Sequence, residues 1–290
     1  MKRFVFLSAF VLAWPSVALA GGGFAYDPPG QLVDGSGKGR VDTNVYAPGI
    51  RYPMESGPAY ANSQVWGHGG TSGPTNSDQC DAENFQYPWH DNYCETRDYS
   101  MPLCPAGTGH QGQDNRAADC KKDVHTTVAV VDGTITSIGS YSVYLTRDDG
   151  VRFDYLHMSN LLVNVGDKVK QGQAIGKVSN HFGTSTTTVH LHFNIFENVK
   201  GVGSVYVPPY TSLIEAYQTL MGLTTPDAGP PPPPAPTNDE TPPAPPPPAP
   251  TADPPPSDDG GCAFATPHGA TTLPTAALLA LLVLAARRKR

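Results

Sequence analysis

Short runs that alternate apolar and polar residues dominate the middle of the chain. Runs of this length, separated by residues that favour turns, are typical of antiparallel β-strands. We therefore expect strands at Thr126–Val131, Thr134–Ile138, Tyr141–Thr146, Arg152–Leu156, Ala174–Val178 and His190–Phe196. The dipeptides Asp132-Gly133 and Asp149-Gly150 have the composition of hairpin turns. The pattern predicts an antiparallel β domain.

The periodicity becomes helical after Pro208-Pro209. Leu213, Ile214, Tyr217 and Leu220 are spaced so that a helix would place them on one face. Such a face most simply packs against a core. We expect a mainly β fold with one helix at its C-terminal end, and we place this domain at residues 106–222.

The two ends of the chain differ from this domain. Residues 1–20 begin with Lys2 and Arg3, continue with an apolar run, and end in Ala18-Leu19-Ala20, the layout of a cleavable secretory signal. The run is shorter than the roughly 20 residues that span a bilayer, which disfavours a permanent anchor. The stretch Pro226–Asp259 is rich in proline and lacks large apolar side chains, so we expect an extended, disordered stalk at residues 223–260.

Residues 261–290 hold Cys262, the apolar stretch Leu273–Ala286 and the basic cluster Arg287–Arg290. This order resembles the C-terminal sorting tails of myxobacterial surface proteins, which are processed near the cysteine. The resemblance implies an exported protein at the cell surface or in the envelope, attached to the outer membrane through the processed tail. We expect membrane contact only through this tail.

Export makes the cysteine count informative. Four cysteines, Cys80, Cys94, Cys104 and Cys120, lie close together, and thiols outside the cytoplasm tend to pair. We expect two disulfides, with three pairings open, and a loop-rich, disulfide-stapled N-terminal region at residues 21–105. A site with four cysteine ligands fits poorly, because the spacings are wide and no C-x-x-C pair occurs.

Charge excludes one class of partner. The formal net charge is −7, but six of the 19 basic residues lie in the signal and in Arg287–Arg290. Without them 13 basic residues remain against 26 acidic ones, a net charge of −13. A body this acidic repels a polyanion, so we do not expect nucleic acid as a partner.

Two histidine motifs carry the candidate chemistry. His190 and His192 are two apart in an apolar strand, so their imidazoles would share one face. His110 and Asp114 are four apart, and Gly112 between them favours an irregular approach to a strand over a helix. Imidazoles and a carboxylate are ordinary zinc ligands, and three of them complete an open catalytic site.

A set of motifs in fixed order contains these residues: His110-x-x-x-Asp114, Tyr155-Leu156-His157, Val165-Gly166-Asp167 with Gly172-Gln173 and Ile175-Gly176, and His190-Leu191-His192. The set resembles the lysostaphin-type (LytM-like) zinc metallopeptidases over about 90 residues. The resemblance implies their fold, an antiparallel β-sandwich or half-barrel with a duplicated hybrid motif. It implies Zn²⁺ bound by His110, Asp114 and His192, and catalytic roles for His157 and His190.

The same resemblance implies an endopeptidase that hydrolyses peptides of bacterial cell-wall peptidoglycan. We separately expect a monomer. A catalytically silent wall-binding or amidase-activating module of the same fold is the alternative. In some relatives an asparagine from the preceding region caps the metal, and Asn62 is the candidate here. His68, His90, His125 and His181 lack partners at zinc spacing, although His181 could border the cleft.

Overall fold

The computed structural model describes residues 18–19 and 23–223, and within them the named strands pair antiparallel. One α-helix, α1 (Tyr210–Leu220), lies near the C-terminal end of this part, and a short 3-10 helix spans Ala82–Phe85. The strands are β1 (Ala18–Leu19), β2 (Ala25–Tyr26), β3 (Tyr60–Ala61), β4 (Gln113–Arg116), β5 (Thr126–Val128), β6 (Gly133–Ile138), β7 (Ser142–Thr146), β8 (Arg152–Leu156), β9 (Met158–Ser159), β10 (Lys168–Val169), β11 (Ala174–Phe182), β12 (Ser185–Val199) and β13 (Gly203–Val207). The predicted fold class, mainly antiparallel β with one C-terminal helix, is confirmed.

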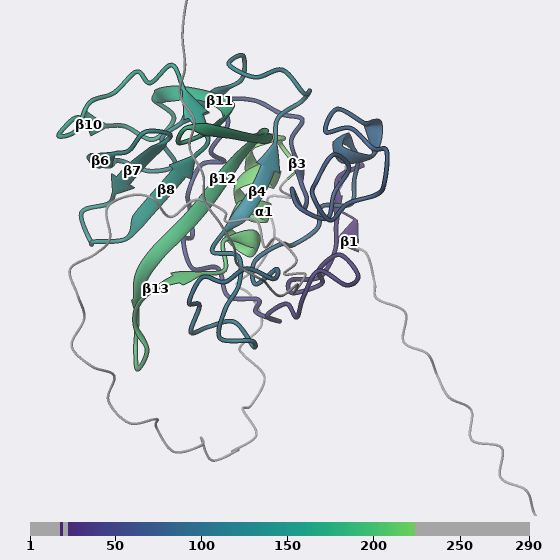
Figure 1. Cartoon of the computed structure of the whole chain (residues 1–290). Helices are drawn as coiled ribbons and strands as arrows, with labels where there is room; N and C mark the ends of the chain where they lie inside the picture. The colour runs from purple at the N-terminus through teal and green to yellow at the C-terminus, as the bar shows by residue number, and fades with distance from the viewer. Residues whose placement is uncertain (1–17, 20–22, 224–290) are drawn as a thin grey trace, which may run out of the picture.

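β12 organises the main sheet, whose path runs β10-β6-β7-β8-β12-β11-β5. It pairs with β8, β11, β13 and β4, and Figure 1 shows it crossing the sheet between β8 and β4. The register places His192 opposite Asp114 of β4 and Leu156 of β8. Since Leu156 directly precedes His157, one strand brings together residues from three distant segments.

All six predicted strands are present, most with shifted ends. Asp149-Gly150 connects β7 and β8 as a hairpin, as predicted. The prediction for Asp132-Gly133 was wrong, because β5 pairs with β11 while β6 pairs with β7 and β10. The Asp132 carboxylate accepts hydrogen bonds from Lys170 and from the Gln171 backbone. These contacts hold the connection between β5 and β6, two consecutive strands that do not pair with each other.

The core fills one side of β12. Its apolar residues Val189, Leu191 and Phe193 are buried in the main hydrophobic cluster, while the alternate positions carry the histidines. Each buried apolar side chain of this size stabilises the fold by about 1.5–3 kcal/mol. Both faces of this stretch are buried, so the imidazoles are covered as well.

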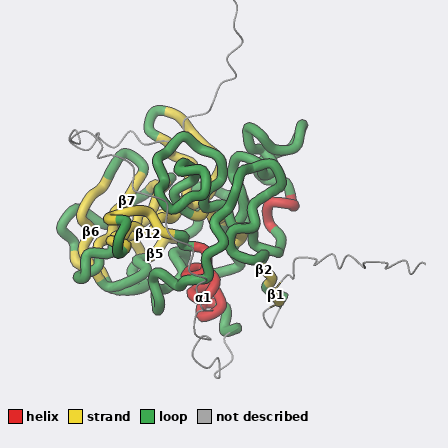
Figure 2. The backbone as a smooth tube through the Cα atoms, turned by 90° about the horizontal axis from the view of Figure 1, so that it is seen from below, coloured by secondary structure: helices red, strands yellow, loops and turns green. Residues whose placement is uncertain are grey.

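The loop-rich segment before β4 packs on the same core. Its buried Trp89 ring lies 4.5 Å from the Tyr217 ring of α1, and Tyr52 lies 5.1 Å from that same ring. Leu213 and Ile214 are buried on the predicted helix face. Figure 2 shows the predominance of loops in the half of the molecule that lies beside α1.

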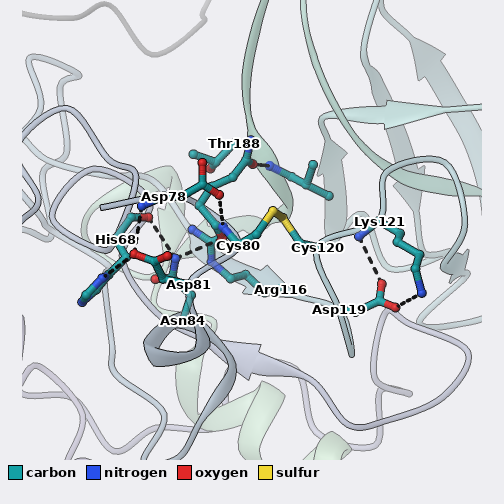
Figure 3. The surroundings of a disulfide bond; sticks show 12 residues. His68, Asp78, Cys80, Asp81, Asn84, Arg116, Asp119, Cys120, Lys121 and Thr188 are labelled. Carbon is teal, nitrogen blue, oxygen red and sulfur yellow. Dashed lines mark hydrogen bonds and ion pairs between the residues drawn. A yellow bond between two sulfur atoms is a disulfide. The ribbon is translucent and has the colours of Figure 1, made fainter. Parts of the chain in front are cut away.

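Two disulfides link the four clustered cysteines, as expected, and exclude a four-cysteine zinc site. Cys94 pairs with Cys104 within one loop, and Cys80 pairs with Cys120 across 40 residues. Figure 3 shows the second bond between a loop that carries His68 and Asp81 and the segment that carries Asp119. It ties the N-terminal region to the chain directly after β4.

No helix among residues 18–19 and 23–223 is long and apolar enough to cross a membrane. The predicted stalk, Cys262 and the apolar tail lie outside the described residues, as does most of the predicted signal. β1, which falls in the range of that signal, pairs with β2.

Candidate metal centre

Three predicted ligands converge at one point. One atom each of His110, Asp114 and His192 lies within 4.8 Å of the others, and all three residues are buried. His110 precedes β4, Asp114 lies in β4, and His192 faces it from β12. His192 Nδ1 lies 2.9 Å from Asp114 Oδ1 and 3.0 Å from His110 Nε2.

Gly112 permits this close approach of β4 to β12. A Cβ atom at this position would overlap the Phe193 carbonyl oxygen and the Asn194 side-chain oxygen. The glycine between the two ligands is therefore a packing requirement, in keeping with the predicted irregular approach to a strand.

Hydrogen bonds behind the two imidazoles fix their orientation. His110 Nδ1 donates to the Asn92 carbonyl at 2.9 Å, and His192 Nε2 donates to Asn194 Oδ1 at 2.6 Å. A neutral imidazole has one donor nitrogen and one acceptor nitrogen. The inner nitrogens, His110 Nε2 and His192 Nδ1, are therefore both acceptors.

Two acceptor nitrogens and a carboxylate oxygen thus face one another with no proton between them. A bound cation satisfies such a group of acceptors. Burial lowers the pKa of His110 to about 4, so this imidazole is neutral at pH 7. Burial acts to raise the pKa of Asp114, but the neighbouring His110 and His190 hold that pKa well below its usual range. Neutral imidazoles and an ionised carboxylate are the ligand forms that bind divalent metal, so the residues fit a metal ion.

The two other predicted histidines lie beside this group. His190 Nε2 is 3.5 Å from Asp114 Oδ1, and the His157 ring lies 4.5 Å from the His190 ring. His157 Nδ1 donates to the His181 carbonyl at 2.8 Å, and His190 Nδ1 donates to the Thr188 carbonyl at 2.9 Å. Each therefore keeps Nε2 as an acceptor. Burial lowers the pKa of His157 well below the ordinary value.

His157 also has a φ of 65°, which is uncommon for a residue with a side chain. Its ring stacks on Tyr141 at 5.7 Å, nearly parallel. Strained backbone of this kind persists where the surroundings hold it, and it clusters at functional sites.

Residues 108–203 match the sequence profile of Peptidase family M23. The chain contains a Peptidase M23 domain. All five predicted site residues fall inside the matched range. The glycyl-glycine endopeptidase ALE-1 of Staphylococcus capitis is 37% identical over 124 residues, which cover 40% of this chain and 32% of ALE-1. The chain thus spans about a third of the length of this curated relative.

Two solved structures are similar to the same part. The catalytic domain of lysostaphin from Staphylococcus simulans is 28% identical, with 40% of this chain and 89% of that chain covered and a TM-score of 0.30. The solution structure of lysostaphin is 31% identical, with 43% and 52% covered and a TM-score of 0.31.

Segments outside the M23 match complete the surroundings of the centre. Asn92 donates from Nδ2 to Asp114 Oδ2 at 2.9 Å, and its own Oδ1 accepts from the Asp114 backbone. A cleft of about 250 Å³ opens on the His190 side. Gln64 and Arg97 line it from outside the match, and Thr188 lines it from within the match. A smaller hollow on the other side is bordered by Tyr99 and Phe182.

The prediction for Asn62 was wrong. Its Nδ2 donates to the Asn84 carbonyl, and its Oδ1 accepts from Gln64 and from Arg116 at 3.2 Å. Both polar atoms are thus occupied away from the M23 ligands. Asn92 is the asparagine that reaches them, and no spacing rule in the sequence distinguishes it from other asparagines of the N-terminal region.

The remaining histidines pair outside the centre. His90 pairs with Asp27 and His125 with Asp119, and His181 contributes only its carbonyl, to His157. His68, Asp81 and Glu83 form a second group of possible ligands. His68 Nδ1 lies 3.1 Å from Asp81 Oδ2, and a hydrogen bond between the two side chains accounts for the contact.

Proposed function

We propose that this protein is a zinc-dependent endopeptidase that hydrolyses peptide bonds of bacterial cell-wall peptidoglycan. The observation that carries the proposal is the convergence of His110 Nε2, Asp114 Oδ1 and His192 Nδ1, with two further imidazoles beside them. The match to Peptidase family M23 and the likeness to a glycyl-glycine endopeptidase support it.

Zinc is the metal that suits this ligand set. It accepts imidazole nitrogen and carboxylate oxygen, and catalytic zinc sites typically hold three protein ligands with one position open. When bound by His110, Asp114 and His192, zinc would lower the pKa of a coordinated water toward neutrality and polarise a substrate carbonyl.

His157 and His190 would handle the proton. Each has its outer nitrogen bonded to a backbone carbonyl, which leaves Nε2 as an acceptor. An imidazole in this form can take a proton from the attacking water and can later donate it to the departing amine. A protonated imidazole at either position would also stabilise the developing oxyanion.

Purified peptidoglycan in a zymogram tests the activity. We expect clearing that a chelator abolishes and that added zinc restores. His192→Ala should lose bound zinc and clearing together, whereas His157→Ala should retain zinc and lose clearing. Unchanged activity of both variants would contradict the roles. Binding to the wall without chelator-sensitive clearing would favour the silent wall-binding or amidase-activating module.

The location and oligomeric state of the protein form a second part of the proposal. The signal pattern and the tail pattern support export to the cell surface or envelope, with attachment to the outer membrane through the tail near Cys262. We also propose that the exported protein acts as a monomer. Mass spectrometry of the protein recovered from envelope fractions would give both ends of the mature chain, and an intact C-terminus in the cytoplasm would contradict this location.

A further inference from the structure

The cleft on the His190 side contains a buried guanidinium. Arg97 lies in the loop between the disulfide partners Cys94 and Cys104, outside the M23 match, and its side chain is 7% exposed. It lines the same cleft as Asp114 and His190. Arg97 thus belongs to the wall that the N-terminal region contributes.

Its hydrogen-bonding capacity is incompletely used. Nη2 lies 3.3 Å from Glu95 Oε2, and Nη1 donates to the Thr96 carbonyl at 2.8 Å. Nε is buried and has no hydrogen-bond partner among the described residues. A guanidinium presents five N–H donors in a fixed fork, and a buried donor without a partner destabilises the fold. Each Nη nitrogen carries two N–H donors and uses one in the contacts with Thr96 and Glu95, so further donors on the two Nη atoms remain for an acceptor in the cleft.

Trp66 and Glu95 hold the Arg97 guanidinium in place. The Arg97 guanidinium lies 5.4 Å from the centre of the Trp66 ring, a distance at which the ring face attracts a cation. Glu95 is fully buried beneath it. With one side on an aromatic ring and one end on Glu95, the guanidinium is oriented before any ligand arrives, which reduces the entropy cost of binding.

Arg97 is the group in the wall of the cleft that suits an anionic ligand. Arg97 is the one lysine or arginine among the described residues that line it, and Asp114 is the one acidic residue. The Asp114 carboxylate is already engaged by His192 and by Asn92. Apart from His190, the other lining residues, among them Gln64, Gln79 and Thr188, carry no ionisable side chain. A planar carboxylate matches the guanidinium fork in shape and charge.

We propose that Arg97 binds a carboxylate of the substrate peptide in this cleft, on the His190 side of the metal centre. The inference rests on the proposed function and deepens it. The preferred substrate carries an acidic side chain or a free chain end close to the cleaved bond, and a peptide of glycine alone without a nearby carboxylate is a poor substrate. A cleft of about 250 Å³ has room for a short peptide segment.

The test compares two forms of one wall. Purified peptidoglycan is treated with carbodiimide and ammonia, which turns its carboxylates into neutral amides, and release of peptides is followed for treated and untreated wall. We expect the full-length, zinc-loaded protein to hydrolyse untreated wall about tenfold faster or more, since hydrogen bonds between charged groups are the strong ones.

Variants of Arg97 test whether this residue causes the preference for untreated wall. Arg97→Gln should reduce the ratio of the two rates to about one, and Arg97→Lys should give an intermediate ratio because it keeps the charge without the fork. Arg147→Gln is the matched control, since Arg147 pairs with Asp149 at the surface. It should keep the ratio of the unaltered protein. Zinc content, measured in parallel, shows whether the variants are folded around the centre.

Each outcome separates the two proposals. Equal hydrolysis of both walls by the unaltered protein, or an undiminished ratio in Arg97→Gln, would overturn the role of Arg97 and leave the peptidase activity standing. Failure to hydrolyse either wall would overturn the proposed function, and with it the inference that rests on it.

Discussion

Replacement of Asn194 by alanine tests whether the residues behind the metal ligands determine metal affinity. Asn194 lies two positions after His192 in β12, and its Oδ1 accepts the His192 Nε2 proton at 2.6 Å. Asn194 also bonds Asp154, which is paired with Arg152 at 2.6 Å. This chain of contacts holds the His192 proton on Nε2 and leaves Nδ1 free for metal.

The structure gives the size of the effect. Without Asn194 the His192 proton can move to Nδ1, where it would donate to Asp114 Oδ1 at 2.9 Å. The metal must then displace a hydrogen bond to a charged group, worth about 1.5–3 kcal/mol. At 1.36 kcal/mol per factor of ten, zinc affinity should fall about 10- to 100-fold, which is the range found for partners of metal-bound histidine.

Competition with a chromophoric chelator measures this affinity. Asn198→Ala is the matched control, because Asn198 lies in the same strand and is exposed. It should bind zinc as the unaltered protein does. Unaltered affinity in Asn194→Ala, with a circular dichroism spectrum like that of the parent, would refute the argument that this hydrogen bond prepares His192 for metal.

Three further predictions concern stability. Gly112→Ala should lower both zinc retention and the urea midpoint, because the added Cβ overlaps the Phe193 carbonyl and Asn194; a midpoint equal to the parent's would show that β4 can move away. Replacement of Cys80 and Cys120 by alanine should reduce the unfolding free energy by about 4 kcal/mol, because the disulfide closes a loop of 40 residues in the unfolded chain. Urea titration measures this free energy, and an unchanged value would indicate that the N-terminal region folds separately. Burial raises the pKa of Asp91 to about 6 from 3.8, so the folded protein should lose about 2 kcal/mol relative to Asp91→Asn as pH rises from 4 to 6. Parallel stability curves for the two proteins would contradict this prediction.

Local signals predicted the parts of the fold that depend on neighbours in sequence. Asp149-Gly150 joins two alternating runs, and β7 and β8 pair across it as expected. The alternation around His190 and His192 likewise placed their imidazoles on one side and Leu191 in the core. In both cases the strand period decides the result within a few residues.

Pairing between distant segments was beyond the reach of these signals. Asp132-Gly133 has hairpin chemistry, yet Asp132 binds Lys170 and the strands on either side pair elsewhere. β4 is short and follows a glycine-rich stretch, so its pairing with β12 shows only when the register sets Asp114 beside His192. Turn propensity is a local property, whereas strand pairing depends on the whole sheet.

The residues of the candidate site likewise include some that local motifs predict and some whose positions depend on distant contacts. His110, Asp114, His157, His190 and His192 stand in motifs with fixed spacing. Asn92 and Arg97 come from a loop-rich segment without periodicity, and their positions depend on the Cys94–Cys104 loop and on packing against Trp66. Their residue types alone do not distinguish them from polar residues that lie at the surface.

The most direct test of the central claim is mass spectrometry of the fragments that the purified protein releases from peptidoglycan, measured for the zinc-loaded protein, the chelated protein and His192→Ala. The account predicts new amino and carboxyl ends at one type of peptide bond, formed only by the zinc-loaded parent. Release of the same fragments by the chelated protein, or by His192→Ala, would contradict a metal centre at His110, Asp114 and His192.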